Sequence, residues 1–226
     1  NYTITVNQGG QDKKGNPLQQ QNVSRFATPP FQVISASPPN STSNVSLNSS
    51  ISAIFSGIVD TGTVRSSLTI IPATTGNLSV NESGFNFQTL NGLRATTTYS
   101  VSISTGVRAK DGTPLSTPYS FSFTTQPFMV SYTYPSNGQT NIYRNSSIEI
   151  YFNAPIDGTS AQSAFSISPA VSGSVSFYIG NPYISFYPSS TMSAQTTYTV
   201  TISTAMKSAS GDNLPSAYSF SFVTGS

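Results

Sequence analysis

Residues 99–125 read YSVSISTGVRAKDGTPLSTPYSFSFTT, and this stretch decides the fold. Aromatic and β-branched residues alternate with serine and threonine at both of its ends, which predicts two half-buried antiparallel strands. The polar connection between them contains Asp111 and Gly112, residues that favour turns. The stretch therefore predicts a β-hairpin with one apolar face.

The same hairpin pattern occurs three times in the chain. Residues 198–224 repeat it, and so do residues 2–28. A longer body of sequence stands before the copies at 99–125 and 198–224, but none stands before the first copy. A hairpin without a sheet of its own is only marginally stable in water. We therefore expect residues 1–28 to need a partner.

The two bodies are also copies of each other. Residues 48–55, NSSISAIF, correspond to residues 145–152, NSSIEIYF, and a constant spacing of 97 becomes 99 after about residue 80. A repeat of this length with about seven short strands is typical of an immunoglobulin-like sandwich. We find no helical stretch. The sequence predicts an all-β chain of an N-terminal β tail at 1–28 and two tandem immunoglobulin-like β-sandwiches at 29–126 and 127–226.

Proline marks the segment before each sandwich. The first linker is Ala27-Thr-Pro-Pro30 and the second is Thr125-Gln-Pro127. Because proline fixes φ and has no backbone N–H, both linkers are expected to be stiff.

The composition excludes several classes of protein. Hydrophobic residues make up 36% of the chain, enough for two cores, whereas charged residues make up 7% and the net charge is +2. So small and scattered a charge predicts no nucleic-acid partner. No apolar run approaches the roughly 20 residues that cross a bilayer, so we expect the chain not to span a membrane. Few carboxylates and no histidine fit an acidic exterior as well as an ordinary secreted protein.

The sequence contains few residues that could support catalysis. The chain contains neither cysteine nor histidine, so thiolate chemistry and a Ser–His–Asp triad are impossible. The seven acids are spread singly, which disfavours a paired-carboxylate site and a calcium site. Those acids are Asp12, Asp60, Glu82, Asp111, Glu149, Asp157 and Asp212, and several read as turn-capping residues. We predict no enzyme activity, no metal and no cofactor other than covalent glycans.

Asn-x-Ser/Thr sequons favour an extracellular location at the cell surface. Seven of the eight lie before residue 82, which suggests a sugar-coated N-terminal half. The candidate N-glycosylation sites are Asn1, Asn22, Asn40, Asn44, Asn48, Asn77, Asn81 and Asn145.

The repeated residues resemble a known family. The strings ISAIFSGIVD and IEIYFNAPID, each followed by a hairpin of the type TTYSVSIS…DGTPL…YSFSFTT, are similar to the bacterial Ig-like repeat of S-layer and other surface proteins. This resemblance implies a spacer or stalk. Few charges, many sequons and a detached N-terminal strand segment also resemble the archaeal thread pilins. That second resemblance implies subunits that join head to tail by donating a strand to a neighbour.

Residues 1–28 carry the functional hypothesis. Tyr2, Ile4 and Val6 alternate with threonine and would supply the side chains of a donated strand, and Phe26 would anchor the return strand. A tail that pairs with a neighbouring copy makes a heterologous contact, which propagates into a filament. The predicted function is a structural subunit of a glycosylated surface filament. Both bodies already contain their closing strands, so the sequence does not identify the acceptor of the tail. Three possibilities remain: the tail adds to a sheet edge, it displaces a native strand, or one body is less complete than its sequence suggests.

Two alternatives remain. In the first, the chain is a piece of a long stalk or S-layer protein, and residues 1–28 finish a domain upstream. In the second, it is an adhesin or carbohydrate-binding module, which would need exposed aromatic residues such as Tyr178 and Tyr183. Other surface proteins and cell-surface glycans are then further candidate partners.

Overall fold

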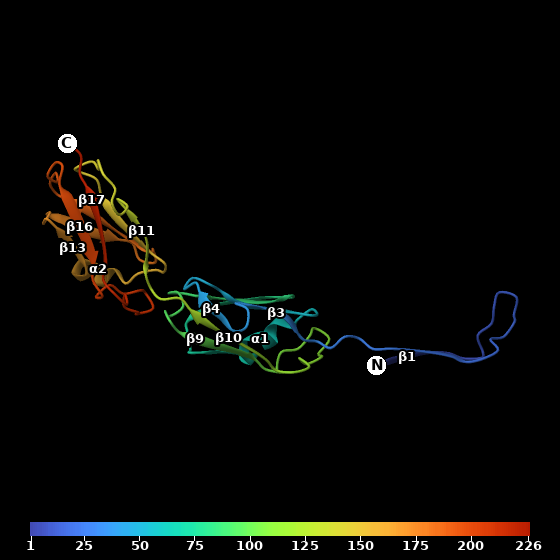
Figure 1. The fold of residues 1–226 in the computed structure, drawn as a ribbon. Helices are drawn as coiled ribbons and strands as arrows, with labels where there is room; N and C mark the ends of the chain where they lie inside the picture. The colour runs from blue at the N-terminus through green and yellow to red at the C-terminus, as the bar shows by residue number, and fades with distance from the viewer.

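The computed structural model describes residues 1–226 as an elongated chain of three parts (Figure 1). A two-stranded hairpin extends from one end, domain 1 lies in the middle, and domain 2 lies at the other end. The parts follow one another in space in the order of the sequence.

The secondary structure is nearly all strand. The hairpin contains β1 (Tyr2–Val6) and β2 (Asn22–Phe26). Domain 1 contains β3 (Val33–Ser37), β4 (Thr42–Val45), β5 (Ile51–Phe55), α1 (Thr61–Ser67), β6 (Leu68–Ile71), β7 (Gly76–Asn81), β8 (Gly84–Thr89), β9 (Thr98–Ile103) and β10 (Tyr119–Thr125). Domain 2 contains β11 (Val130–Tyr134), β12 (Ile148–Phe152), α2 (Gly158–Ala164), β13 (Phe165–Ser168), β14 (Gly173–Phe177), β15 (Tyr183–Pro188), β16 (Thr197–Ile202) and β17 (Tyr218–Val223).

Each domain is a sandwich of two sheets. In domain 1 the strand orders are β3-β5-β8-β7 and β4-β10-β9-β6, and in domain 2 they are β11-β12-β15-β14 and β13-β16-β17. The pairings are antiparallel except that of β4 with β10, which is parallel. In domain 2 this parallel strand is reduced to a single bridge between Ile142 and Thr224. The predicted fold class, two tandem immunoglobulin-like sandwiches, is confirmed.

The alternating pattern of the sequence fills the space between the sheets. On β5, Ile51, Ala53 and Phe55 are buried, whereas Ile54 faces outward and is 47% exposed. The cores of the two domains form separate clusters of 18 and 20 buried residues. Period-two alternation therefore identified the buried faces correctly.

The expectation of no helix is wrong. Helices α1 and α2 begin after Asp60 and Asp157, whose side chains accept hydrogen bonds from Gly62 N and Thr159 N, both at 3.1 Å. These two aspartates are helix N-caps, a more specific role than the turn capping we predicted. Each helix has seven residues, too few to give an apolar period that could be recognised in the sequence.

Candidate assembly site at the N-terminal hairpin

The hairpin β1–β2 has the geometry of the strand pair that closes each domain. Tyr2 pairs with Phe26, and their rings stack with centroids 5.1 Å apart. The corresponding pairs are Tyr99–Phe123 in domain 1, at 5.4 Å, and Tyr198–Phe222 in domain 2, at 5.8 Å. Three copies of one sequence pattern thus give three copies of one strand pair.

The connection between the strands is repeated as well. Leu18 N donates to Gly10 O at 2.8 Å, and Gly15 has a φ of +83°. The equivalent bonds are Leu115 N to Val107 O and Leu214 N to Met206 O, and the equivalent glycines are Gly112 (φ +88°) and Gly211 (φ +92°). Because glycine adopts such a φ without strain, the sequence of the connection itself specifies the conformation of the turn.

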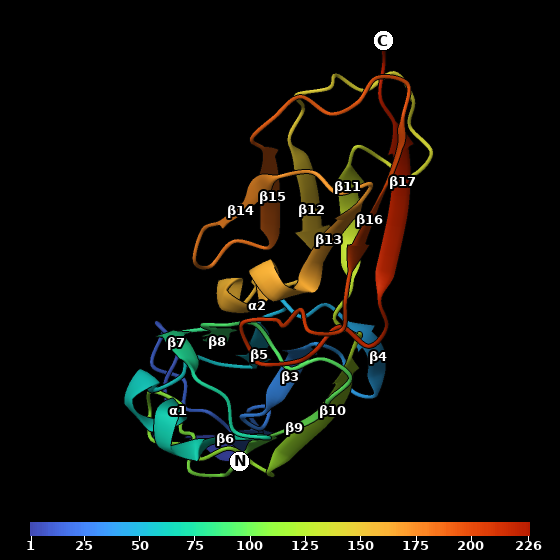
Figure 2. The ribbon, with the colours of Figure 1, turned by 90° about the vertical axis from the view of Figure 1, so that its left-hand side faces the viewer.

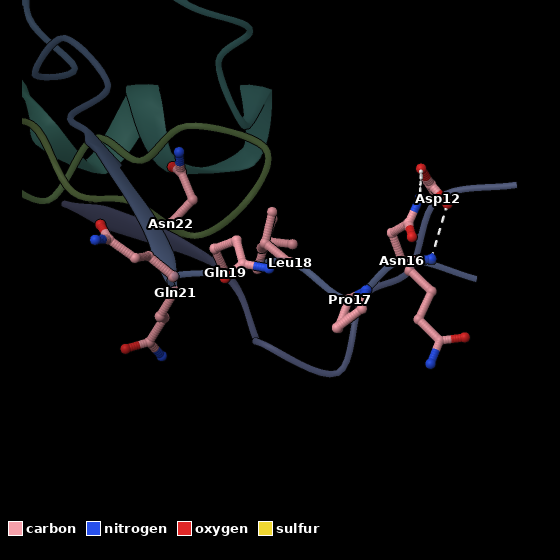
Figure 3. Close-up of a pocket in the computed structure, with 11 residues that line it drawn as sticks. Asp12, Asn16, Pro17, Leu18, Gln19, Gln21 and Asn22 are labelled. Atoms are coloured by element: carbon pink, nitrogen blue, oxygen red, sulfur yellow. Dashed lines mark hydrogen bonds between the residues drawn. The ribbon is translucent and has the colours of Figure 1, made fainter. Parts of the chain in front are cut away.

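The far end of the hairpin is held by one carboxylate (Figure 3). Asp12 accepts hydrogen bonds from the backbone and side-chain nitrogens of Asn16 and from Lys14 N, at 2.8–2.9 Å. The bond from the Asn16 side chain, followed by those from the two backbone amides, holds the pKa of Asp12 below its ordinary value. Leu18 lies beside an open pocket lined mainly by polar residues and is 38% exposed.

Burial separates β1–β2 from its counterparts. The four predicted interface residues lie on one face of the hairpin, and all of them are exposed: Tyr2 by 56%, Ile4 by 55%, Val6 by 48% and Phe26 by 50%. Their counterparts Tyr99, Val101, Ile103 and Phe123 are at most 1% exposed. The structure therefore brings the predicted side chains together on a face that, in both domains, is covered by the opposite sheet.

Two positions on this face are polar. Asn22 and Ser24 pair with Val6 and Ile4, whereas the same positions of domain 1 hold Tyr119 and Phe121. The apolar side chains of the hairpin are therefore concentrated on β1 and at Phe26. Comparing the three copies position by position would have revealed this difference from the sequence.

The joint between the domains is a second site, which the alternating sequence pattern does not reveal. We call residues 46–48 and 92–95 the base of domain 1, and residues 153–155 and 208–213 the top of domain 2. Figure 2 shows the two domains meeting end to end at this point. The side chain of Leu47, from the base, is fully buried and belongs to the core cluster of domain 2.

Polar contacts fix the same joint. Asp212 accepts hydrogen bonds from Ala95 N at 2.8 Å and from Arg94 Nε at 3.4 Å, and its side chain is only 13% exposed. Asn48 Nδ2 donates to Asn153 O at 3.3 Å. We had predicted an ordinary turn residue at Asp212. The signal that could have identified it is a break in the repeat, since Thr113 holds the equivalent position in domain 1.

A buried tyrosine completes this end of domain 1. The hydroxyl of Tyr99 accepts a hydrogen bond from Arg94 N at 2.9 Å, and its ring is fully buried. Desolvation by burial raises the pKa of Tyr99, although the bond from Arg94 N opposes that rise. Ser193 N donates to Tyr198 in the same way in domain 2, so the contact is part of the repeat.

All eight candidate glycosylation sites are exposed, and their modification remains a prediction. Asn48 differs from the others because Nδ2, the atom that would carry a glycan, makes the contact with Asn153 O in the joint. A glycan at Asn48 would require that contact to be given up.

The aromatic residues considered for glycan binding do not form one open platform. Tyr183 stacks on Tyr151 with ring centroids 5.1 Å apart, and the ring of Tyr132 is tilted against that of Tyr151 at 5.7 Å. These three tyrosines lie on the neighbouring strands β15, β12 and β11. The Tyr151 hydroxyl donates to Glu149 at 2.9 Å, and this bond raises the pKa of Tyr151. Tyr178 stands apart in the turn after β14 and is 67% exposed.

No group of three or more histidine, cysteine, aspartate or glutamate residues gathers to hold a metal ion. No helix of the chain has the length and apolarity needed to span a bilayer. The features that the geometry does assemble, an uncovered closing hairpin and a built joint between sandwiches, define a modular structural protein of tandem immunoglobulin-like domains.

The chain belongs to the bacterial Ig-like domain family. The family model matches it twice, at residues 27–125 and 125–224. This domain is structural rather than catalytic. No curated protein matches the chain.

Solved structures are similar to parts of the chain at low identity. The N-terminal part of the bacterial S-layer protein SbsC is 15% identical, with a TM-score of 0.33, over 85% of this chain and 44% of that one. An L,D-transpeptidase from Mycobacterium smegmatis is 13% identical, with a TM-score of 0.36, over 66% of this chain and 62% of that one. L,D-transpeptidase 3 from Mycobacterium tuberculosis is 13% identical, with a TM-score of 0.33, over 56% and 48%. The chain spans about half the length of these structures.

Proposed function

We propose that the chain is a structural unit of a glycosylated extracellular filament or stalk, in which the hairpin β1–β2 closes an Ig-like body outside residues 1–226. The observation that carries this proposal is the contrast in burial between Tyr2 and Tyr99, two residues in the same geometry that are 56% and 0% exposed. Recognition would be by β-augmentation, in which main-chain hydrogen bonds pair the strands and alternate side chains enter the core.

The hydrophobic effect supplies the driving force for this closure. Burial of an aromatic or aliphatic side chain stabilises a protein by about 1.5–3 kcal/mol, and the hairpin offers Tyr2, Ile4, Val6 and Phe26. The turn and the Tyr2–Phe26 stack are already formed, so less conformational entropy is lost on binding than for an unstructured tail. The occupant is therefore an Ig-like body that lacks its own closing hairpin.

The proposal takes two forms. If the body belongs to another copy, the contact is heterologous and the product is a head-to-tail filament. That copy must then release a closing hairpin of its own, because both domains here hold theirs with Phe123 and Phe222 buried. If the body lies on the same polypeptide, the product is a stalk of consecutive domains and nothing needs to be displaced.

A refolding experiment tests the closure. Residues 29–97, the body of domain 1 without β9 and β10, would be refolded with the full chain, and hydrogen exchange of the β1 and β2 amides would be measured. We expect protection of both strands. Ile4→Asp should abolish the protection, whereas Thr5→Asp, on the opposite face of β1, should leave it. If β1 and β2 of the unsubstituted chain also exchange rapidly after refolding with residues 29–97, the proposal is contradicted.

Electron microscopy of the purified full chain separates the two forms. Long fibres whose repeat corresponds to two domains, and which disappear when residues 1–28 are deleted, would support the filament. Monodisperse particles of one chain would rule out the filament and favour the stalk. Intact-mass spectrometry of the secreted protein reports the glycan load.

A further inference from the structure

We propose that the outer end of domain 1 is a docking surface for the base of the Ig-like body that β1–β2 closes. This surface, the top of domain 1, consists of Ser56, Gly57, Ile58, Lys110, Asp111 and Thr113. The proposal rests on the proposed function for the identity of the occupant. In addition, the body is held in a fixed orientation on domain 1, the same orientation that domain 1 has relative to domain 2.

The backbone of this surface is the same as that of the covered top of domain 2. Val59 bridges to Ala109 as Ile156 bridges to Ser208. Lys110 N donates to Ile58 O, and the equivalent bond in domain 2 runs from Ala209 N to Pro155 O, both at 2.8 Å. The two loops that support the joint are therefore present in domain 1, in the same arrangement.

Burial shows that domain 1 lacks the cover that domain 2 has. Ala154 is fully buried and belongs to the core cluster that also contains Leu47 of the base, and a Cβ placed on Gly92 of the base would lie 3.8 Å from Pro155 Cδ. The equivalents of Ala154 and Pro155 are Gly57 and Ile58, which are exposed, Ile58 by 53%. An apolar side chain thus faces solvent at a position that, in domain 2, lies under the preceding domain.

The linker before domain 1 is held by the same hydrogen bonds as the linker before domain 2. Ser56 Oγ accepts from Gln32 N at 3.0 Å and donates to Pro30 O at 3.2 Å. In domain 2 the Asn153 side chain makes the equivalent bonds, from Met129 N at 2.9 Å and to Pro127 O at 2.8 Å. The chain therefore enters both domains along the same path, and a body attached ahead of domain 1 is directed onto its top.

Tyr2 connects the hairpin with the surface. This residue lines the same pocket as Pro29, Ile58 and Asp111. In domain 1 the equivalent Tyr99 hydroxyl accepts a hydrogen bond from Arg94 N, in the loop that contacts domain 2. The Tyr2 hydroxyl is thus placed to accept the corresponding N–H of the docked body.

Charge favours the same occupant. The base of domain 1 carries Arg94, which pairs with Asp212 on the opposing turn. The equivalent turn of domain 1 carries Asp111, while the neighbouring Lys110 is already paired with Glu82 at 3.0 Å. A carboxylate on this turn fits a base that presents a cation and free backbone N–H groups.

A three-body chain tests the docking. Residues 29–97 would be fused directly before Asn1, so that Thr97-Asn1-Tyr2 continues in the register of Thr97-Thr98-Tyr99. The chain has no cysteine, so spin labels attach only at engineered positions. Gln8, Thr105 and Thr204 are equivalent exposed turn residues of the three hairpins. Double electron–electron resonance would compare the Gln8→Cys/Thr105→Cys pair with the Thr105→Cys/Thr204→Cys pair.

We expect the two distance distributions to share their mean and width. In domain 1, Ile58→Asp should broaden only the Gln8–Thr105 distance distribution. Ile54→Asp in domain 1, on the outer face of β5, should change neither distribution. Asp111→Lys should also broaden the Gln8–Thr105 distribution. Adding Arg94→Glu in the added body to that variant should narrow the distribution again.

Hydrogen exchange on the same chain separates the two hypotheses. Protected β1–β2 amides with a Gln8–Thr105 distribution much broader than the Thr105–Thr204 distribution would overturn the docking surface and leave the closure intact. Unprotected β1–β2 amides in this fusion, where the body is tethered in register, would overturn the closure and the docking together.

Discussion

The hairpins β1–β2 and β9–β10 have the same fold and opposite surroundings. They share strand register, turn hydrogen bonds and a stacked Tyr–Phe pair, yet Tyr99 is fully buried whereas Tyr2 is 56% exposed. Local sequence therefore specifies the hairpin, and the sheet opposite it specifies its burial. The same substitution should therefore have different effects in a covered element and in its uncovered copy.

The largest contrast is at the tyrosines themselves. Tyr99→Ala should lower the free energy of unfolding by about 3–5 kcal/mol, as for other buried aromatic residues, because it leaves a cavity in the core. Tyr2→Ala should leave the unfolding of both domains unchanged in the isolated chain. Urea denaturation followed by tyrosine fluorescence measures both, and Tyr198→Ala is the control for domain 2. Equal effects of Tyr2→Ala and Tyr99→Ala would show that the hairpin packs on the domains.

The next contrast is between the covered and the uncovered joint. Leu47→Ala should destabilise the chain by about 2–5 kcal/mol, because the side chain is fully buried in the core cluster of domain 2. Ile58→Ala, on the uncovered top of domain 1, should stay within about 0.5 kcal/mol. Urea denaturation is again the measurement. A negligible effect of Leu47→Ala would mean that the two domains separate in solution.

A smaller effect is expected at the carboxylates of the two turns. Asp212→Ala removes the acceptor of the partly buried Ala95 N–H, and the loss of such a hydrogen bond should cost about 1 kcal/mol. Asp111→Ala should cost less, because that carboxylate is exposed and accepts from Thr113 N only within its own turn. Spin-label distances between the domains should broaden for Asp212→Ala and remain unchanged for Asp111→Ala.

The smallest expected effect is a pH dependence at Tyr99. Its pKa in the folded domain is raised above the value of about 10 in the unfolded chain, so the unfolded chain loses its proton first. Stability from this group is complete below pH of about 10 and falls as the pH rises through the higher folded pKa. Unfolding free energies on both sides of that pH should show the decline, and Tyr99→Phe should make it less steep.

The sequence predicted the sandwiches and the hairpins because both arise from local alternation. Ile51, Ala53 and Phe55 occupy the buried face that their period of two indicates. The helices α1 and α2 were missed because they are short and depend on the N-caps Asp60 and Asp157.

The joint could not be predicted from alternation. Arg94 and Asp212 meet across 118 positions of sequence. Leu47 is an apolar residue like those of the domain cores. No local sequence pattern indicates that it packs in the core of the neighbouring domain rather than in the core of its own domain. Only the positions where the copies differ, such as Leu47 against Arg144, mark the surface where two domains meet.

The direction of the chain through domain 1 has a mechanical consequence. The polypeptide enters domain 1 at its outer end and leaves it beside domain 2 (Figure 1). The last strand before the exit, β10, pairs with β9 over Tyr119–Thr124 and with β4 at Phe123 and Thr125. A tensile load between the two ends therefore pulls along the strands and strains their hydrogen bonds together in shear. A domain loaded in shear resists extension better than one whose bonds break one after another.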